Sequence, residues 1–359
     1  MLVDDKYFLG VDVGSVSTNM VLLRPDNTVK EALYLRTQGR PMQIIQEGIK
    51  QIRSKIGKSA EIIGVGATGS ARQLAATLLG ADVVKNEITA HAVAASRVNP
   101  QVQTILEIGG QDSKIIILRD GVVSDFAMNT VCAAGTGSFL DQQASRLGIK
   151  IEEFGPLALE AKNPVRIAGR CSVFAESDMI HKQQLGHSLP DILAGLCQAM
   201  VRNYLNNVGK NKDIRGPIFF QGGVAANPGI CKAFEEEIGQ SIIVPENYDV
   251  MGALGAAYLA QEKVGSRPGT LTQFRGLNLG ETQFQAKSFD CTGCANRCEV
   301  VEITQDGASL ARWGDRCGKW SGAGVAGTIT GTSEVNLKEE KQKEEKQKEE
   351  KQKEEKRGA

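Results

Sequence analysis

Apolar stretches and glycine-rich turns alternate along most of the chain, and their spacing predicts strands and helices in mixed order. Residues 7–24 predict two apolar strands joined by a Gly-Ser turn, and 28–36 predict a third strand. Helical spacing of apolar residues predicts helices at 42–56, 70–79 and 88–98. A short apolar run predicts a further strand at 61–66. Strands interleaved with helices in this way are typical of an α/β protein.

The strand pattern recurs about 97 residues further along the chain. Residues 103–119 predict a strand, a Gly-rich turn with an acidic residue and a second strand, and 122–127 predict a third. We interpret the recurrence as a weak internal repeat of two similar lobes, at 5–100 and 101–249. The remaining expected elements are strands at 217–221 and 241–244 and helices at 135–147, 189–208, 228–238 and 250–262, the last completing the first lobe.

Composition narrows the class of protein. The 359 residues are enough for two domains of roughly 150 residues each, and 41% of them are hydrophobic, which is enough for a core. Lys plus Arg and Asp plus Glu both total 42, so the chain lacks the basic excess of a nucleic-acid-binding protein. The 40 glycines indicate many tight turns and close approaches of backbone to ligand.

Neither end of the chain predicts membrane insertion or secretion. The N-terminal residues lack a basic region followed by an apolar stretch, and no apolar run reaches about 18 residues. We therefore expect a cytoplasmic protein that binds no membrane. Lys338–Arg357 repeats the letters KEEKQ without an apolar residue, so we interpret 321–359 as a linker and a solvated, partly helical tail, with a docking tail as the alternative.

Two acidic glycine turns are candidates for phosphate binding. In the first, Asp12 precedes Gly14, Ser15 and Thr18, so that backbone amides and hydroxyls can donate to phosphate while Asp12 reaches a hydrated Mg²⁺. The second turn, Gly109-Gly110-Gln111-Asp112, repeats the arrangement, although neither matches the GxxxxGK[ST] pattern. Either turn alone is more commonly a simple turn. Facing each other across a cleft, the two would clamp a triphosphate, with catalytic residues Asp12, Gln111 and Asp112.

A third glycine turn completes the expected nucleotide site. A buried strand ends in Gly222-Gly223, over which a nucleoside can approach, and a helix starts after Asn227. Asn227 is a candidate for cofactor binding, and helix capping is its alternative role. The start of the helix expected at 135–147 contributes three more cofactor-binding candidates, Gly135, Thr136 and Gly137.

The order of these turns resembles that of the superfamily of actin, hexokinase and heat-shock chaperone ATPases. Over about residues 7–262 the chain more closely resembles the ATP-dependent activators of 2-hydroxyacyl-CoA dehydratases and benzoyl-CoA reductases. The resemblance is carried by GVDVGSVSTN, GATGSAR, IGGQDSK, MNTVCAAGTGSFLD, CSVFAESD and QGGVAANPG. It implies two ribonuclease-H-like lobes, and a homodimer that holds one 4Fe–4S cluster. It also implies that ATP hydrolysis to ADP pushes one electron, supplied by reduced ferredoxin or flavodoxin, onto an acyl-CoA dehydratase or reductase.

Two cysteines fit the implied cluster. Cys132 and Cys171 each lie at a predicted helix start, where the helix N-terminus stabilises a thiolate. A 4Fe–4S cluster needs four ligands, and a symmetric dimer supplies four by doubling two. The alternative is that both are small buried cysteines, as expected for Cys197 and Cys231 on their helices.

Four further cysteines predict a separate module at 289–320. Cys291, Cys294, Cys298 and Cys317 follow the spacing C-x₂-C-x₃-C-x₁₈-C around a predicted β-hairpin. Four thiolates suit Zn²⁺ or an iron–sulfur centre, and reduced thiols are the alternative. The module resembles a segment of much longer members of the family, so we expect either a short form or one piece of an interrupted gene.

Three functions remain open from the sequence. The favoured one is an ATP-driven iron–sulfur electron donor to an acyl-CoA dehydratase or reductase. The second is a small-molecule kinase of the same fold, for example an amino-sugar kinase, which would give Cys132 and Cys171 no role. The third is a non-catalytic, nucleotide-dependent scaffold. Stoichiometric iron would separate the first from the other two.

Overall fold

The computed structural model describes residues 5–57, 59–266, 269 and 271–321. The chain divides into two compact units, with the boundary between Glu281 and Thr282. The predicted tail at Lys338–Arg357, and the predicted linker beyond Ser321, lie outside the described residues. Among the described residues, no helix is long and apolar enough to cross a membrane.

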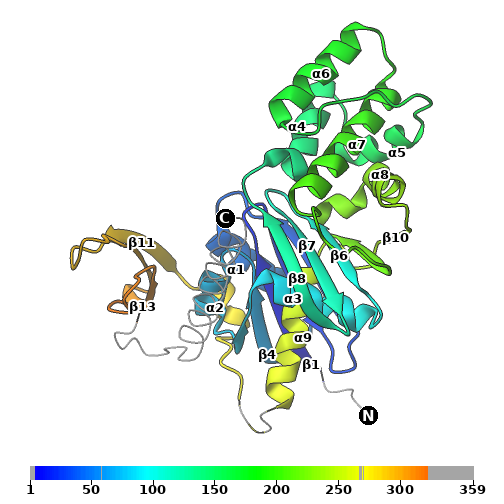
Figure 1. Ribbon diagram of the computed structural model, residues 1–359. Coiled ribbons are helices and arrows are strands. Elements are labelled where there is room, and N and C mark those ends of the chain that lie inside the picture. Colours follow the sequence, from blue (N-terminus) through cyan, green and yellow to red (C-terminus); the bar gives the residue numbers. More distant parts are fainter. Residues whose placement is uncertain (1–4, 58, 267–268, 270, 322–359) are drawn as a thin grey trace, which may run out of the picture. The chain divides into compact units, whose positions relative to one another are not determined.

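The first unit contains two five-stranded sheets (Figure 1). The first sheet has the order β3-β2-β1-β4-β5. Its first three strands form an antiparallel meander, to which two more strands add in parallel. The strands are β1 (Lys6–Val13), β2 (Ser17–Leu23), β3 (Val29–Arg36), β4 (Glu61–Thr68) and β5 (Val83–Val84).

The second sheet repeats this topology in the order β8-β7-β6-β9-β10. Again an antiparallel meander comes first and two parallel strands join it. The strands are β6 (Thr104–Ile108), β7 (Ser113–Arg119), β8 (Val122–Asn129), β9 (Ile218–Gln221) and β10 (Ile242–Ile243). The matching topology confirms the α/β class and the internal repeat predicted from the sequence.

Glycines allow one helix to pack very closely on the first sheet. The helices of this lobe are α1 (Pro41–Lys55), α2 (Arg72–Leu79), α3 (Glu87–Val98) and α9 (Met251–Gly265). A Cβ atom at Gly10 of β1 would lie 1.8 Å from the carbonyl oxygen of Ala253, and one at Gly255 would lie 1.9 Å from that of Ala90. Helix α9 therefore contacts β1 and α3 backbone to backbone, although it comes from the end of the unit.

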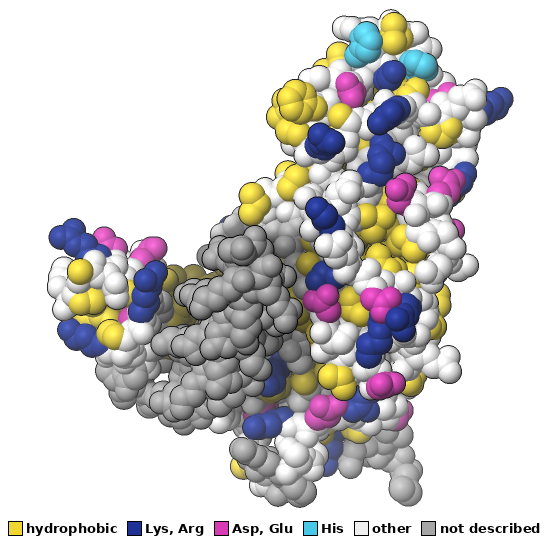
Figure 2. Space-filling model, in the orientation of Figure 1, with side chains coloured by type: hydrophobic (Ala, Val, Ile, Leu, Met, Phe, Trp, Pro, Cys, Tyr) yellow, Lys and Arg dark blue, Asp and Glu magenta, His cyan; other side chains and the backbone are white. Residues whose placement is uncertain are grey.

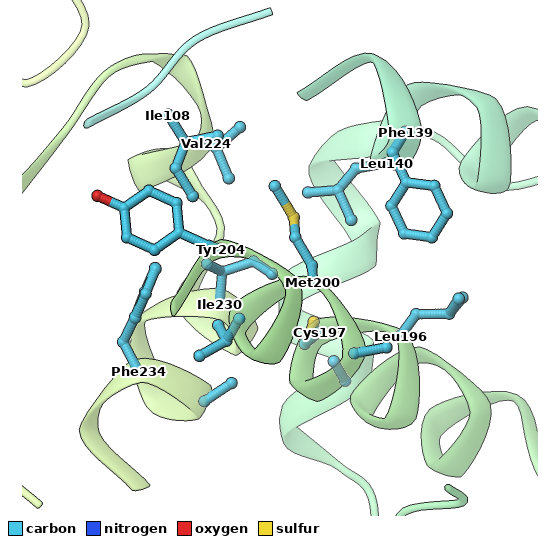
Figure 3. Packing of buried hydrophobic residues seen from close by; sticks show 14 of the residues in the cluster. Ile108, Phe139, Leu140, Leu196, Cys197, Met200, Tyr204, Val224, Ile230 and Phe234 are labelled. Atoms are coloured by element: carbon cyan, nitrogen blue, oxygen red, sulfur yellow. The ribbon is translucent and has the colours of Figure 1, made fainter. Parts of the chain in front are cut away.

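The second lobe has a larger helical layer with its own core. Its helices are α4 (Gly137–Leu147), α5 (Ile151–Leu159), α6 (Ser172–Gln184), α7 (Leu189–Asn207) and α8 (Pro228–Ile238). Figure 3 shows Tyr204 of α7 packed among buried side chains such as Phe234 and Met200. The Tyr204 hydroxyl donates to the carbonyl oxygen of Lys114 at 2.6 Å, which ties this core to β7 beside the predicted phosphate turn.

The second unit contains one antiparallel sheet of three strands in the order β11-β12-β13. The strands are β11 (Phe284–Asp290), β12 (Glu299–Gln305) and β13 (Ala308–Trp313). The hairpin expected from the sequence is thus part of a larger sheet that begins before residue 289. Asp306-Gly307, with φ of 51° and 84°, forms the tight turn between β12 and β13.

Candidate functional site

Two adjoining cavities of about 260 Å³ each lie between the two lobes of the first unit. Both are lined by Val16 and Tyr34 of the first lobe and by Gly109, Gly110 and Gly223 of the second. The two cavities therefore adjoin. Several carboxyl groups line the first, whereas the lining of the second is more apolar. A polar and an apolar compartment joined in this way suit a phosphorylated ligand with an organic ring.

The first phosphate turn brings three of its four predicted residues to the first cavity. Asp12, Gly14 and Ser15 line the first cavity. Thr18 does not line it, because side chains alternate along β2 and Thr18 points to the opposite face from Ser17 and Asn19. Its buried hydroxyl lies 3.0 Å from that of Thr37, so in this structure it bonds inside the first lobe.

The second phosphate turn joins the cavity to a helix. Gly109, Gly110, Gln111 and Asp112 all line the first cavity. The carbonyl oxygens of Gly109 and Gly110 accept hydrogen bonds from the backbone N–H groups of Gly137 and Ser138, at 2.8 and 2.9 Å. The Ser138 hydroxyl adds a bond of 2.6 Å to the carbonyl of Gly110. The turn is thus fixed directly to the first residues of α4.

The third glycine turn also reaches the cavities. Gly222 has a φ of +89°, and a Cβ atom there would lie 2.4 Å from the carbonyl oxygen of Ile108, so only glycine fits. Asn227 caps α8 by accepting from the backbone N–H groups of Gly229 and Ile230 at 3.0 and 3.1 Å. It also lines the second cavity, where its buried Nδ2 has no hydrogen-bond partner. Capping and ligand contact are therefore compatible roles for Asn227.

The predicted candidates at residues 135–137 have different positions. Gly137 lines the second cavity, but neither cavity is lined by Gly135 or Thr136. Gly135 is packed against Asn203, whose Oδ1 would lie 2.8 Å from an added Cβ atom, and Thr136 donates to the carbonyl of Ala133 at 2.8 Å. In this structure both residues contribute to the turn after Cys132, and their assignment to the cofactor stays a prediction.

A buried charge network lies beneath the phosphate turns, and most of it escaped sequence reasoning. The ammonium group of Lys114 contacts the carboxylates of Glu87, Asp112 and Glu107 at 2.7, 2.9 and 3.0 Å. Burial lowers the pKa of Lys114, but these carboxylates, Glu107 foremost, outweigh it and raise that pKa well above its usual value. The sequence did contain one signal, because Glu107 and Lys114 are charged residues within apolar strands. Charged side chains are seldom buried unless they are paired with an opposite charge.

The network leaves the cavity with excess negative charge. Burial, followed by repulsion from Glu87, raises the pKa of Asp12 to about 7. Burial also raises the pKa of Glu107 to about 8, and it lowers that of His91 to about 3, so this imidazole is neutral beside Gln221 at 2.8 Å. Carboxylate oxygens in such excess suit a hard cation such as Mg²⁺, held largely through water and phosphate.

One asparagine holds the two predicted cluster cysteines in place. The Sγ of Cys132 lies 3.8 Å from Oδ1 of Asn203 on α7, and Nδ2 of Asn203 donates to the carbonyl of Gly169 at 2.5 Å. Gly169 lies two residues before Cys171, which precedes the first residue of α6. Both thiols are free and partly exposed. The structure thus attaches both cysteine loops to the same side chain.

Exposed apolar side chains flank these cysteines. Val131, directly before Cys132, is 95% exposed. Val173 and Phe174, which closely follow Cys171, are 66% and 64% exposed. In Figure 2, apolar side chains reach the surface of the helical part of this unit. Large exposed apolar residues gathered near a functional group mark an interaction surface.

The four cysteines of the second unit remain a predicted metal site. Cys291 is buried, Cys298 is intermediate and Cys294 and Cys317 are exposed, and all four are free. The nearby indole of Trp320 and then the backbone N–H of Gly293 lower the pKa of the Cys291 thiol. Within the part of the chain that the structure describes, no group of three or more His, Cys, Asp or Glu side chains is gathered closely enough to hold a metal ion.

The two lobes share one strand topology and have a glycine-lined cleft between them, which is the fold of the actin/hexokinase-like ATPases. The chain belongs to the BadF/BadG/BcrA/BcrD ATPase family, whose sequence model matches residues 9–260. The second unit lies outside that match.

Two dehydratase activators match this chain over nearly their whole length. The chain is 36% identical over 265 residues to the (R)-2-hydroxyglutaryl-CoA dehydratase activating ATPase of Acidaminococcus fermentans, which covers 72% of this chain and 98% of that protein. It is 33% identical to the 2-hydroxyisocaproyl-CoA dehydratase activator of Clostridioides difficile, over 71% of this chain and 94% of that one. A solved structure of the activator of the 2-hydroxyisocaproyl-CoA dehydratase from Clostridium difficile, with bound ADPNP, matches with a TM-score of 0.65 and 30% identity. That match covers 74% of this chain and 98% of the other.

Proposed function

We propose that this protein is an ATP-hydrolysing iron–sulfur activator that passes one low-potential electron to a 2-hydroxyacyl-CoA dehydratase or a benzoyl-CoA reductase-type partner. The family and the named activators support this class of function. The observation that carries the proposal is one continuous path of contacts. It runs from the phosphate turn at Gly109-Gly110, through the first residues of α4, to the loop of Cys132.

The residues at this loop fit a 4Fe–4S cluster shared by two copies of the chain. Cys132 and Cys171 present two free, partly exposed thiols from loops attached to Asn203. A two-fold axis beside them would bring together four thiols, which is the number of ligands that such a cluster requires. When bound, the cluster would accept and release one electron.

The exposed side chains of Val131, Val173 and Phe174 support the homodimer. They are neighbours of the two cysteines in the sequence and are exposed, so a second copy that supplies its own thiols would also cover these apolar groups. An isologous contact of this kind buries the same patch on both subunits. We therefore propose that dimer formation and completion of the cluster site are one event.

At the nucleotide site, we propose that the backbone of Gly109 and Gly110 and the hydroxyl of Ser15 bind the phosphates of ATP. Asp12 and Asp112 would hold hydrated Mg²⁺, and Gln111 would orient the water that attacks the terminal phosphate. Lys114 keeps the buried carboxylates in place and limits their repulsion. Gly222, Gly223 and Asn227 border the space for the nucleoside.

The bonds from Gly137 and Ser138 give nucleotide state a way to act on the cysteines. A shift of the Gly109-Gly110 turn must either move the start of α4 or break two backbone hydrogen bonds. A coupling free energy of about 1.4 kcal/mol, which is in the usual range for such coupling, corresponds to roughly 59 mV for one electron. Reduced ferredoxin or flavodoxin is the proposed donor, and the acyl-CoA substrate would bind to the partner enzyme alone.

An EPR redox titration on anaerobically purified protein tests this proposal. We expect a reduced-cluster signal whose midpoint potential differs by tens of millivolts between the ADP form and the ADPNP form. Ser138→Ala removes the hydroxyl bond to Gly110, so it should reduce that difference while the signal remains. Ser177→Ala, which removes a hydroxyl on α6 that bonds only to the carbonyl of Val173, is the matched control. A potential that is the same with both nucleotides would contradict the proposed coupling.

A further inference from the structure

All four cysteines of the second unit lie in segments that extend from the same end of its three-stranded sheet. Asp290, the last residue of β11, pairs with Glu299, the first residue of β12, and β13 ends at Trp313, which pairs with Val301. The end of β11, the start of β12 and the end of β13 therefore lie together. Cys291 follows the first of these points, Cys294 and Cys298 lie in the loop to the second, and Cys317 follows the third.

The loop between β11 and β12 turns tightly around the sulfur of Cys291. The backbone N–H of Gly293 donates to Sγ of Cys291 at 3.4 Å, so the chain turns around this sulfur between Cys291 and Cys294. The backbone N–H of Cys291 donates to the carbonyl of Cys298 at 2.8 Å, which closes the loop at its base. Three cysteines are thus held on one short loop, with one sulfur already accepting an amide N–H.

The segment that carries Cys317 folds back toward this loop. The carboxylate of Asp315 accepts from the backbone N–H groups of Trp320 and Ser321 at 2.8 and 3.3 Å, so the chain curls around Cys317. The Trp320 ring then packs edge-on against Phe289, two residues before Cys291, at 4.9 Å between ring centroids. The loop of Cys317 is therefore fixed at both ends beside the loop of Cys291.

Two groups beside the sulfurs suit bound thiolates. A Cβ atom built on Gly293 would lie 3.1 Å from Nζ of Lys319 and 3.5 Å from Sγ of Cys291, so this cation and this sulfur flank the same backbone position. The indole Nε1 of Trp320 is buried and meets no acceptor with hydrogen-bond geometry. A positive charge and a spare N–H donor offset the negative charge that four metal-bound thiolates bring.

Few apolar side chains are buried in the described part of this unit. Among residues 282–321 only Cys291, Val300, Ile303 and Thr304 are buried. Domains of about 40 residues usually need a disulfide, a metal ion or a partner in addition to their core. All four cysteines are free thiols, so a disulfide does not supply this constraint.

We propose that Cys291, Cys294, Cys298 and Cys317 bind one structural Zn²⁺ ion as a tetrathiolate site. In the described part of the chain the four sulfurs are not gathered closely enough to hold an ion. Cys294 and Cys317 are exposed on the two loops, so zinc must draw their sulfurs onto itself as it binds. Metal binding of this kind gathers ligands and folds small domains in the same step. A single ion fits two short loops at one end of a three-stranded sheet. The four cysteines belong to the second unit, whereas Cys132 and Cys171 belong to the first.

Metal analysis of the full-length chain, purified anaerobically with zinc in the medium, tests this inference. We expect about one zinc per chain, falling to less than about a fifth of that in Cys317→Ser and in Cys294→Ser. Both residues are exposed, so the substitutions leave the small core intact. Cys231→Ser in the first unit is the control and should keep full zinc. Replacement of zinc by Co²⁺ should give the intense thiolate-to-cobalt absorption of a tetrahedral site.

The remaining outcomes are decisive in either direction. Loss of zinc together with new proteolytic cleavage inside 282–321, while the first unit stays intact and hydrolyses ATP, supports a structural ion. Zinc that stays at the wild-type level in both variants would overturn the proposal, as would iron bound at these cysteines in place of zinc. Cys132→Ser should leave zinc unchanged, so failure of the proposed electron transfer and failure of this site are distinguishable.

Discussion

At the scale of single residues, the site depends on Lys114 and the carboxyl groups around it. Lys114 is 2% exposed and contacts three carboxylates that come from a turn, a strand and α3. Sequence reasoning found Asp12 and Asp112 because each lies in a recognisable glycine turn. It could not assemble the network, because Glu107 lies opposite Lys114 only once β6 has paired with β7, and Glu87 reaches Lys114 from α3 of the other lobe.

The raised pKa of Glu107 makes stability depend on pH. Its pKa is about 8 in the folded protein, well above the ordinary value of 4.5. The folded protein therefore keeps a proton that the unfolded chain releases, so stability decreases as pH rises from about 4.5 to 8. We expect the melting temperature of the ligand-free protein to be lower at pH 8 than at pH 5.

A substitution isolates this contribution. Glu107→Gln keeps an acceptor for Lys114 but cannot ionise, so the difference in melting temperature between pH 5 and pH 8 should shrink. Each kcal/mol corresponds to a shift of about 2–4 °C in a domain of this size. The exposed residue Glu160 provides the control Glu160→Gln, which should leave the difference unchanged. An undiminished pH dependence in Glu107→Gln would show that this carboxyl group does not carry it.

At the scale of elements, the pattern of apolar residues predicted most helices and strands of the first unit. It did not predict α5, which contains Gly155-Pro156, a pair that is typical of a loop. The glycine is needed there because a Cβ atom would lie 2.5 Å from Oδ1 of Asn227, at the start of α8. Tertiary packing therefore decided this element. β11 was also missed, because this edge strand is largely exposed and carries little apolar signal.

The close contact of α9 gives a prediction at this scale. Gly255→Ala would force a Cβ atom against the carbonyl oxygen of Ala90, so we expect the first unit to lose about 1–3 kcal/mol of unfolding free energy. Gly265→Ala, in the same helix, meets no atom within 4 Å and should change stability by less than about 1 kcal/mol, in the stabilising direction. Urea unfolding of both variants measures the difference. Equal stabilities would mean that α9 does not pack as closely as described.

At the scale of the whole molecule, the repeat of strand topology could be predicted because both lobes begin with the same strand–turn–strand pattern. The cleft between the lobes could be predicted because the two phosphate turns occupy equivalent positions in the repeat. Two features could not be derived from one sequence. The attachment of both cysteine loops to Asn203 depends on α7, which is far along the chain from Cys132, and the surface around Val131 becomes visible only in the folded unit.

That surface gives a prediction about assembly. Phe174→Asp places a charge in the proposed dimer contact, so we expect a monomer that binds ATP but holds little iron. Val122 is also exposed but begins β8, at the end of that strand away from Cys132. The control Val122→Asp should therefore remain a dimer with full iron content. Light scattering coupled to size-exclusion chromatography, with iron analysis of each peak, distinguishes the two variants. A Phe174→Asp protein that remains a dimer would place the contact elsewhere.

The central claim is that two cysteines on each chain share one cluster across a dimer. Its most direct test is the amount of iron and acid-labile sulfide per chain in protein purified without air. We expect about two irons and two sulfides per chain, lost in both Cys132→Ala and Cys171→Ala and retained in Cys197→Ala. Four irons per chain, or iron that survives both substitutions, would contradict the shared cluster, and protein without iron would contradict electron transfer altogether.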